Sequence, residues 1–326
     1  MRDIINLTPA RKERIGTIVV GLVLMAAIVL TGCDIPSGKR DTGVASDVPN
    51  PVATTVAAGS LTETPVASEP ATTVPAVVTY EDAERVFREG RYSEAEGLFS
   101  AYVERKPENS FGYYMLGLSA WKAGDHERAV QALTRAFELD RTHVKSHLNL
   151  ARVLLETGKS LEALERLDTA LTLDSTSNVV YRLRGRALAD LGHTDAAADA
   201  YRRALVLDPS DVWSMNNLGL LFFQQGWYDE ALYPLARAVA LDSAVATFQN
   251  NLGMALEHTG RYAQAAEAYK RAIAADPTYV KANANLARVE GRENDPLIEP
   301  ADFGALAAEF ERQMQGWGST VVGVKQ

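Results

Sequence analysis

Residues 178–211 have the sequence NVVYRLRGRALADLGHTDAAADAYRRALVLDPSD, and their pattern recurs at a fixed interval along the chain. Six glycines mark this interval and stand 34 residues apart: Gly90, Gly124, Gly158, Gly192, Gly226 and Gly260. Each glycine is followed five residues later by an alanine. A constant period of about 20 to 50 residues is typical of stacked repeats, and a 34-residue period is typical of helix–turn–helix units. The sequence therefore predicts a stack of helix pairs.

Each unit is predicted to hold two helices that bury their apolar faces against neighbouring units. In residues 178–211, Tyr181, Leu188 and Leu191 recur at helical spacing and predict a first helix. Gly192 ends this helix, because the residue after a helix often needs a positive φ, which glycine adopts without strain. The apolar positions of the second helix are Ala197, Tyr201, Ala204 and Leu205. Neither helix can bury its stripe alone, so the fold depends on stacking.

This pattern resembles the tetratricopeptide repeat. The residues that carry the resemblance in two units are Leu218, Gly219, Phe222, Gly226, Tyr228, Ala231 and Ala238, and Leu252, Gly253, Leu256, Gly260, Tyr262, Ala265, Tyr269, Ala272 and Pro277. The resemblance implies an all-α, right-handed solenoid of about six and a half helix–turn–helix repeats over residues 80–292. It also implies that the first helices line a concave groove. A capping box at Thr79 and Asp82 is predicted to open the first helix.

Residues 293–326 are predicted to form a C-terminal capping helix and a tail. The apolar residues that fall on one face of this helix are Phe303, Leu306, Ala307, Phe310 and Met314. The end of a solenoid exposes apolar surface, so a terminal element with one polar face is needed to cover it. We therefore expect this helix to close the end of the array.

Residues 1–32 resemble the signal peptide of a bacterial lipoprotein, because basic residues precede an uncharged apolar run that ends in Leu30-Thr31-Gly32-Cys33. The resemblance implies a lipid on Cys33 and a membrane-anchored protein of the bacterial cell envelope that faces the periplasm. The choice between inner and outer membrane stays open. The alternative is a retained transmembrane anchor, since Ile15–Cys33 is uncharged and just long enough to span a bilayer. Residues 33–79 hold six of the thirteen prolines and are expected to be a disordered linker.

The sequence carries no motif for catalysis or for binding a cofactor. It lacks a phosphate-binding glycine loop, a nucleophile elbow, a paired-cysteine metal motif and a His-Glu-x-x-His motif. His143 and His147 lie four residues apart, but no third ligand lies nearby, so we interpret them as surface histidines. The formal net charge of −9 argues against binding to nucleic acid. We therefore expect no enzymatic activity, no metal and no cofactor.

Asparagines recur at the sixth position of successive first helices. These are Asn149, Asn217, Asn251 and Asn285, with Asn216 and Asn250 directly before two of them. An asparagine amide both donates and accepts hydrogen bonds. The row resembles the asparagine ladder in the repeat domain of O-linked N-acetylglucosamine transferases, which implies contact with the backbone of an extended peptide. The alternative is that these amides bond neighbouring helices to one another.

Aromatic and basic residues also fall at groove positions of the first helices. The aromatic ones are Trp121, Trp213 and Phe223, and the basic ones are Arg152, Arg182, Arg186 and Arg288. Aromatic side chains often carry binding energy in protein interfaces, and arginine binds carboxylates well. They are candidates for a peptide-binding groove. The alternative is that these residues belong to the hydrophobic core and are only partly exposed on the first helices.

Taken with the resemblances, these features predict a membrane-tethered scaffold that binds extended segments of envelope proteins. Lipoproteins built of tetratricopeptide repeats help to assemble pili and secretion complexes, and this chain is similar in plan. The alternative is an adaptor that brings envelope proteases or peptidoglycan hydrolases to their substrates. The sequence does not name the partner.

Overall fold

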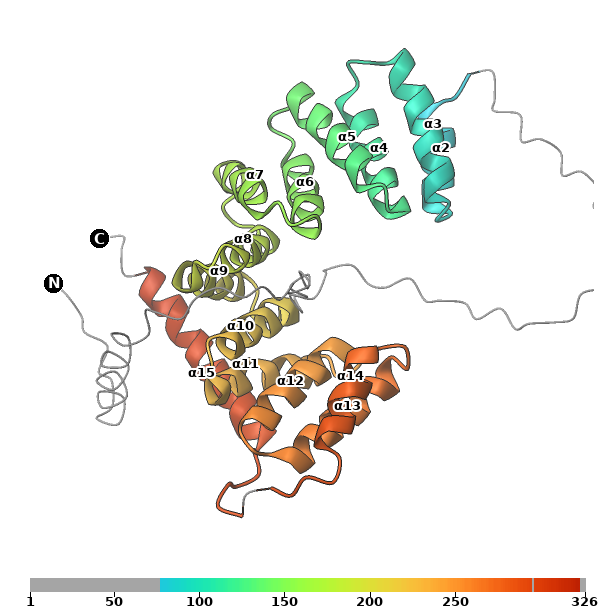
Figure 1. The fold of residues 1–326 in the computed structure, drawn as a ribbon. Coiled ribbons are helices and arrows are strands. Elements are labelled where there is room, and N and C mark those ends of the chain that lie inside the picture. The colour runs from blue at the N-terminus through green and yellow to red at the C-terminus, as the bar shows by residue number, and fades with distance from the viewer. Residues whose placement is uncertain (1–76, 295, 323–326) are drawn as a thin grey trace, which may run out of the picture. The chain divides into compact units, whose positions relative to one another are not determined.

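The computed structural model describes residues 77–294 and 296–322 (Figure 1). Cys33, the predicted signal segment and residues 33–76 of the predicted linker lie outside these residues. The last part of that linker belongs to the fold, because Val78 is buried and its carbonyl oxygen accepts a hydrogen bond from Arg105. None of the helices described is both long and apolar enough to cross a membrane.

The described residues form helices and no strands, and the helices follow one another in pairs. The first helices of the pairs are α2 (Tyr80–Arg88), α4 (Ser110–Ala123), α6 (Val144–Glu156), α8 (Asn178–Asp190), α10 (Val212–Gln224), α12 (Ala246–His258) and α14 (Val280–Val289). The second helices are α3 (Tyr92–Arg105), α5 (His126–Leu139), α7 (Ser160–Leu173), α9 (Thr194–Leu207), α11 (Tyr228–Leu241) and α13 (Tyr262–Ala275). The predicted all-α solenoid of about six and a half repeats is confirmed, and α15 (Phe303–Val322) follows it.

The turn inside each repeat depends on the periodic glycine. All six of these glycines adopt a positive φ, between 75° and 90°. At Gly226 nothing lies within 4 Å of the place where a Cβ would stand, so the backbone conformation alone selects glycine there. The predicted capping box is also present, because Thr79 accepts from the backbone N–H of Asp82 and Asp82 accepts from that of Thr79. Local sequence therefore sets where these helices begin and end.

A second glycine lets the two helices of a repeat lie close together. A Cβ added at Gly253 would stand 2.5 Å from the ring of Tyr269, which is fully buried on α13. The same relation holds between Gly185 and Tyr201, where the distance is 2.6 Å. The missing side chain is what allows a large aromatic ring to fill the space between the helices.

An aspartate makes the turn between successive repeats. Asp140, Asp174, Asp208, Asp242 and Asp276 each follow a second helix, in an extended conformation. Each carboxylate accepts from the backbone N–H two residues later, over 2.9 to 3.1 Å. An Asx turn of this kind reverses the chain with local bonds alone. The proline that often accompanies it is therefore dispensable, and Arg141 or Ser175 takes its place without changing the turn.

The array is tighter on the side of the first helices than on the side of the second helices. Among the described residues, every first helix contacts the next first helix, whereas no second helix contacts the next second helix. The second helices therefore diverge and leave furrows between them. The first helices lie on the inner side of the resulting curve.

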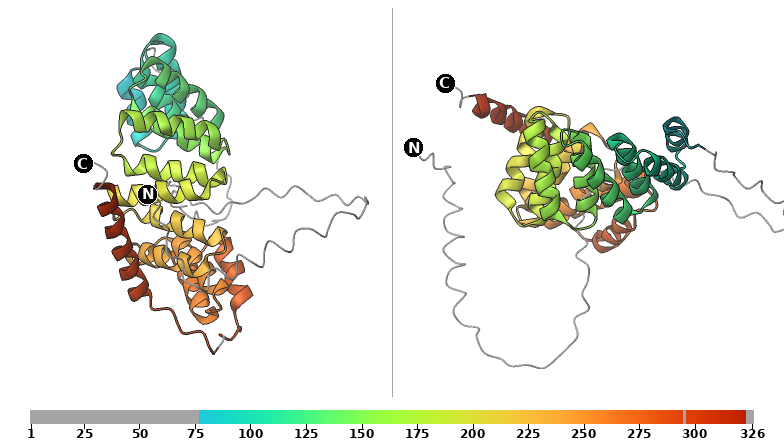
Figure 2. Two further views of the ribbon diagram at one scale, coloured as in Figure 1. Left: turned by 90° about the vertical axis from the view of Figure 1, so that its left-hand side faces the viewer. Right: turned by 90° about the horizontal axis from the view of Figure 1, so that it is seen from above.

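The predicted position of the C-terminal helix is wrong. We expected α15 to close the end of the array at α14, but it folds back and packs against α11 and α9, as Figure 2 shows. Its predicted apolar face does bury Ala307, Phe310 and Met314. The furrow between α9 and α11 offers this face an apolar surface to cover. The described residues 290–294 and 296–302 contain no helix and allow the chain to reach it.

Candidate functional site: the inner face of the first helices

The candidate residues of the predicted groove all lie on first helices. We call their side chains the first-helix face, made up of Phe111, Tyr114 and Trp121 on α4, Asn149 and Arg152 on α6, Arg182 and Arg186 on α8, Trp213, Asn216, Asn217 and Phe223 on α10, Asn250 and Asn251 on α12, and Asn285 and Arg288 on α14. Consecutive first helices contact one another, so these side chains come from neighbouring helices. They differ strongly in exposure, and this decides what each of them can bind.

Five asparagines form one continuous chain of hydrogen bonds. Asn285 donates to Asn250, Asn250 to Asn251, Asn251 to Asn216, and Asn216 to Asn217. The two bonds between helices are 2.9 Å long, and the two within helices are 3.4 Å long. Asn216 and Asn250 are almost completely buried. These amides therefore bond neighbouring helices to one another, which is the second of the two interpretations that the sequence allows.

A similar hydrogen bond between first helices joins α4 to α6, with a tyrosine hydroxyl as the acceptor in place of an asparagine. Asn149 is buried and donates to the hydroxyl of Tyr114 over 3.0 Å. Donor and acceptor are 35 residues apart here, as they are at both inter-helix asparagine bonds. The residues at the equivalent positions of α6 and α8 are Leu148 and Leu183, and both belong to one apolar cluster. A spacing of 35 residues between polar side chains is the signal in the sequence that predicts these bonds.

Two of the four candidate arginines are held in ion pairs. Arg182 is buried and lies 2.7 Å from a carboxylate oxygen of Asp211, which is also buried. Arg288 makes two bonds of 2.6 and 2.7 Å to Glu257, which accepts a third from the hydroxyl of Tyr269. Burial raises the pKa of Glu257, but the bonds from Arg288 and Tyr269 outweigh it and lower the pKa overall. These arginines join repeats.

The other two arginines lie at equivalent positions of α6 and α8, and both are half-buried. Arg152 donates to Asn149 over 3.4 Å. Burial raises the pKa of the Asp190 carboxyl. Arg186 lies near this carboxyl, and its positive charge offsets only part of the rise. Both guanidinium groups lie in the middle of the first-helix face.

The predicted aromatic residues are mostly enclosed. Trp121 is buried, and its indole N–H donates to Glu156 over 2.7 Å. Trp213 is half-buried against Phe248, with ring centroids 4.9 Å apart. Phe223 is half-buried between Tyr228 and His258, with its centroid 5.2 and 4.9 Å from theirs. Each of these rings contacts a residue of another helix.

One exposed aromatic residue was missing from the predicted set. Phe111, at the start of α4, is 47% exposed. Its ring stacks on Tyr80 and on Tyr114, with centroids 5.7 and 5.5 Å away and interplanar angles below 30°. His143 lies against the edge of the same group, 4.9 Å from Tyr114. The sequence signal for Phe111 is its position three residues before Tyr114, because residues three apart share a helix face.

This group of four rings, which we call the aromatic patch, is uncharged at neutral pH. Burial raises the pKa of Tyr80 to about 12 and lowers the pKa of His143 below its ordinary value. Two stacked rings, those of Tyr80 and Tyr114, and the edge-on ring of His143 hold Phe111 in place before any partner arrives. The aromatic patch is therefore a preformed apolar anchor on the first-helix face.

Nothing in the described residues forms a metal site, since no group of three or more histidine, cysteine, aspartate or glutamate side chains comes together there. The prediction that His147 lies at the surface is wrong. Its ring is 2% exposed, packs against Phe137, and shares a hydrogen bond of 3.1 Å with the carbonyl oxygen of Arg141. Burial lowers its pKa. Its role is structural.

Four models of repeat families match the chain, and two of the matched ranges overlap. Residues 185–226 match a "TPR repeat", and residues 114–178, 212–241 and 246–279 match a "tetratricopeptide repeat". No curated protein matches the sequence. The helices α2, α3 and α14 lie outside the matched residues and join the array by their geometry.

Solved structures of similar fold share little sequence with this chain. A thermophilic TPR protein of Thermus thermophilus is 20% identical, covers 55% of this chain and 98% of its own, and has a TM-score of 0.50. A tetratricopeptide repeat protein from Parabacteroides merdae is 13% identical over 64% and 82%, with a TM-score of 0.55. The Cut9–Hcn1 hetero-tetramer of the APC/C is 20% identical over 64% and 41%, with a TM-score of 0.56. At such identities the likeness concerns the fold: the helices from α2 to α14 form an all-α solenoid of helix pairs, and residues 114–178, 185–241 and 246–279 of it match tetratricopeptide repeats.

Proposed function

We propose that this protein is a non-enzymatic scaffold, tethered to a membrane of the bacterial envelope, that binds a segment of a partner protein on its first-helix face. The fold supports a role in protein–protein interaction. The tether rests on the lipobox-like sequence that ends at Cys33. The partner belongs to a pilus or secretion complex in this proposal, by similarity to lipoproteins of the same plan.

One observation carries the proposed binding mode. Phe111 exposes nearly half of its surface on the inner side of the array, although three other rings pack around it. A large aromatic side chain held rigidly in a partly apolar surface is the usual form of an interface hot spot. Beyond α4 the face continues into Arg152 and Arg186. A segment with an apolar side chain for Phe111, followed by an acidic residue for Arg186, matches this order.

The Phe111→Ala variant is expected to lose its partner without losing its fold. Removing the anchor of an interface typically weakens binding by about 2 kcal/mol or more, which is roughly 30-fold in affinity. The measurement is crosslinking in intact cells of the host, followed by purification and mass spectrometry of the captured proteins. We expect the main partner of the wild-type chain to fall to background in the variant.

Leu161→Ala is the matched control for this experiment. Leu161 is a 62% exposed apolar residue as well, but it lies on the second helix α7. Its variant is expected to capture the same partner as the wild-type chain. Equal capture by Phe111→Ala and wild type would contradict the proposed binding mode. A captured set of proteases or peptidoglycan hydrolases, in place of pilus or secretion components, would favour the adaptor role.

The membrane tether makes a separate prediction at Cys33, the only cysteine of the chain. In the Cys33→Ser variant, metabolic labelling with a radioactive fatty acid is expected to disappear, because the thiol that receives the lipid is gone. A precursor of larger mass is expected to accumulate, since cleavage before the cysteine follows lipidation in the lipoproteins that this segment resembles. Unchanged mass and the absence of label in the wild-type chain would show a retained transmembrane anchor.

A further inference from the structure

The furrow between α9 and α11 shows how this array binds a helix. Phe310 and Met314 of α15 are buried in one apolar cluster with residues from the walls and floor of the furrow, namely Leu205, Met215 and Leu218. An ion pair of 3.3 Å between Arg237 and Glu311 flanks this cluster. The guanidinium of Arg202 lies 5.7 Å from the ring of Trp317. An amphipathic helix with a carboxylate on its flank is therefore the ligand of this furrow.

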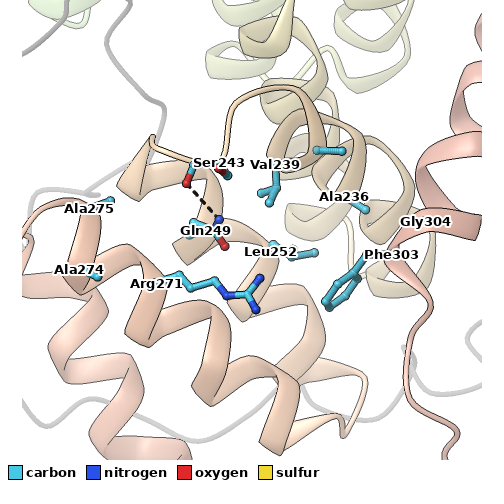
Figure 3. A pocket seen from close by; sticks show the side chains of 11 residues that line it. Ala236, Val239, Ser243, Gln249, Leu252, Arg271, Ala274, Ala275, Phe303 and Gly304 are labelled. Carbon is cyan, nitrogen blue, oxygen red and sulfur yellow. Dashed lines mark hydrogen bonds between the residues drawn. The ribbon is translucent and has the colours of Figure 1, made fainter.

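The next furrow, between α11 and α13, is open. It holds a cavity of about 720 Å³, and the residues that line it include Ala236, Val239, Gln249, Leu252, Arg271 and Phe303 (Figure 3). Most of these side chains are apolar. Phe303 and Gly304, at the start of α15, form one end of the cavity, and the rest of α15 runs over α11 and α9.

The two furrows are copies of each other, displaced by one repeat of 34 residues. The residues of the filled furrow and their equivalents in the open furrow are Leu205 and Val239, Met215 and Gln249, Leu218 and Leu252, and Arg237 and Arg271. The aliphatic wall, the leucine of the floor and the flanking arginine are all preserved. Gln249, a buried polar residue, stands in place of Met215, so the open furrow shares the aliphatic wall, the leucine and the flanking arginine of the furrow that binds α15 and differs from it at this one position.

Arg271 is available to a carboxylate from outside. Its guanidinium has an ion pair of 3.3 Å with Glu267, one turn away on the same helix, and both side chains are more than half exposed. An exposed pair of this kind contributes little and can be exchanged. Figure 3 shows the arginine side chain extended along the cavity that Leu252 and Phe303 also line.

We propose that the furrow between α11 and α13 binds an amphipathic helix of a partner protein. This helix carries large apolar side chains four residues apart, as Phe310 and Met314 are, and an acidic residue next to them that pairs with Arg271. The site lies on the side of the second helices, so it is distinct from the first-helix face. The smaller residue Ala236 stands where Arg202 contacts Trp317, so the incoming helix needs no aromatic residue there.

A peptide with the sequence of residues 301–322 is a suitable probe, because α15 is the helix that fits the equivalent furrow. A hydrocarbon staple between positions 308 and 312, both exposed in α15, holds the peptide helical. Added to the full chain, a fluorescent form of this peptide is expected to bind saturably, with one peptide per chain. Absence of binding by this preformed helix would overturn the proposal.

Three variants of the chain and one of the peptide locate the bound peptide. Arg271→Glu is expected to weaken binding about tenfold, since it turns an attractive flank into a repulsive one. A peptide with Glu311→Arg is expected to bind the Arg271→Glu chain better than the unchanged peptide does. Arg135→Glu, the same change at the equivalent position of α5, is the matched control and is expected to leave peptide binding unchanged, because α5 contacts neither α11 nor α13. Ala274→Trp, on an exposed position of α13, is expected to block the cavity.

Two outcomes would contradict this assignment. Binding that responds to Arg237→Glu, the same change in the furrow that α15 fills, and is indifferent to Arg271→Glu would mean that the peptide displaces α15 from its own furrow. Self-association of the full chain in sedimentation velocity, lost in Arg271→Glu, would mean that a second copy of this chain occupies the furrow. The wild-type chain is expected to sediment as a monomer.

Discussion

Asp211→Ala is expected to lower the free energy of unfolding by about 3–5 kcal/mol, the typical effect of removing one partner from a buried ion pair. Asp211 and Arg182 have side chains that are 2% and 9% exposed, and their closest atoms are 2.7 Å apart. Asp211 also caps α10, accepting from the backbone N–H and the hydroxyl of Ser214. The variant loses the ion pair and the cap together, at the junction of two repeats.

Two further variants test the cause of this loss. Asp229→Ala removes an exposed ion pair with Arg261, 3.4 Å long, and is expected to change stability by about 1 kcal/mol at most. Combining Asp211→Ala with Arg182→Leu is expected to recover part of the loss, because no buried charge remains unpaired. Chemical denaturation of each chain measures these differences. An effect of Asp211→Ala no larger than that of Asp229→Ala would contradict the role assigned to the pair.

Replacing Asn216 and Asn250 together by alanine is expected to destabilise the array by about 2–4 kcal/mol, because each lost buried hydrogen bond leaves a polar group without its partner. Each of the two residues accepts from the next first helix and donates to its own neighbour. The change therefore breaks the chain of amides at both junctions, α10 to α12 and α12 to α14.

Asn283→Ala is the control for the asparagine pair. Asn283 is an exposed asparagine on α14 with a single long bond to the carbonyl oxygen of Tyr279. Its replacement is expected to change stability by less than about 0.5 kcal/mol. If the Asn216 and Asn250 variant melted at the wild-type temperature, the amide chain would have no structural role.

Much of the fold follows from local features that the sequence displays directly. A glycine such as Gly226 and a capping box such as that of Thr79 act within one or two turns of helix, so their residues are close in sequence. The 34-residue period then repeats the same local instruction. Stacking of the repeats buries the apolar face of every helix, so the array could be predicted as well.

The features that sequence reasoning missed depend on contacts between distant residues. The place of α15 is decided by the divergence of α9 and α11, which no segment of the sequence encodes alone. The positive charge of Arg182 is visible in the sequence, but its pairing with Asp211, 29 residues away, is not. Phe111 was overlooked because its exposure depends on how Tyr80 and Tyr114 stack around it.

The central proposal is that the aromatic patch binds the partner, while the asparagine chain holds the repeats together. One experiment tests both halves, by measuring partner capture in cells and thermal unfolding for the same two variants, Phe111→Ala and the Asn216 and Asn250 pair. We predict that Phe111→Ala loses the partner and melts like the wild-type chain, whereas the asparagine variant melts at a lower temperature and still captures the partner below that temperature. An asparagine variant that melts normally but loses the partner, beside a Phe111→Ala variant that keeps it, would contradict the proposal.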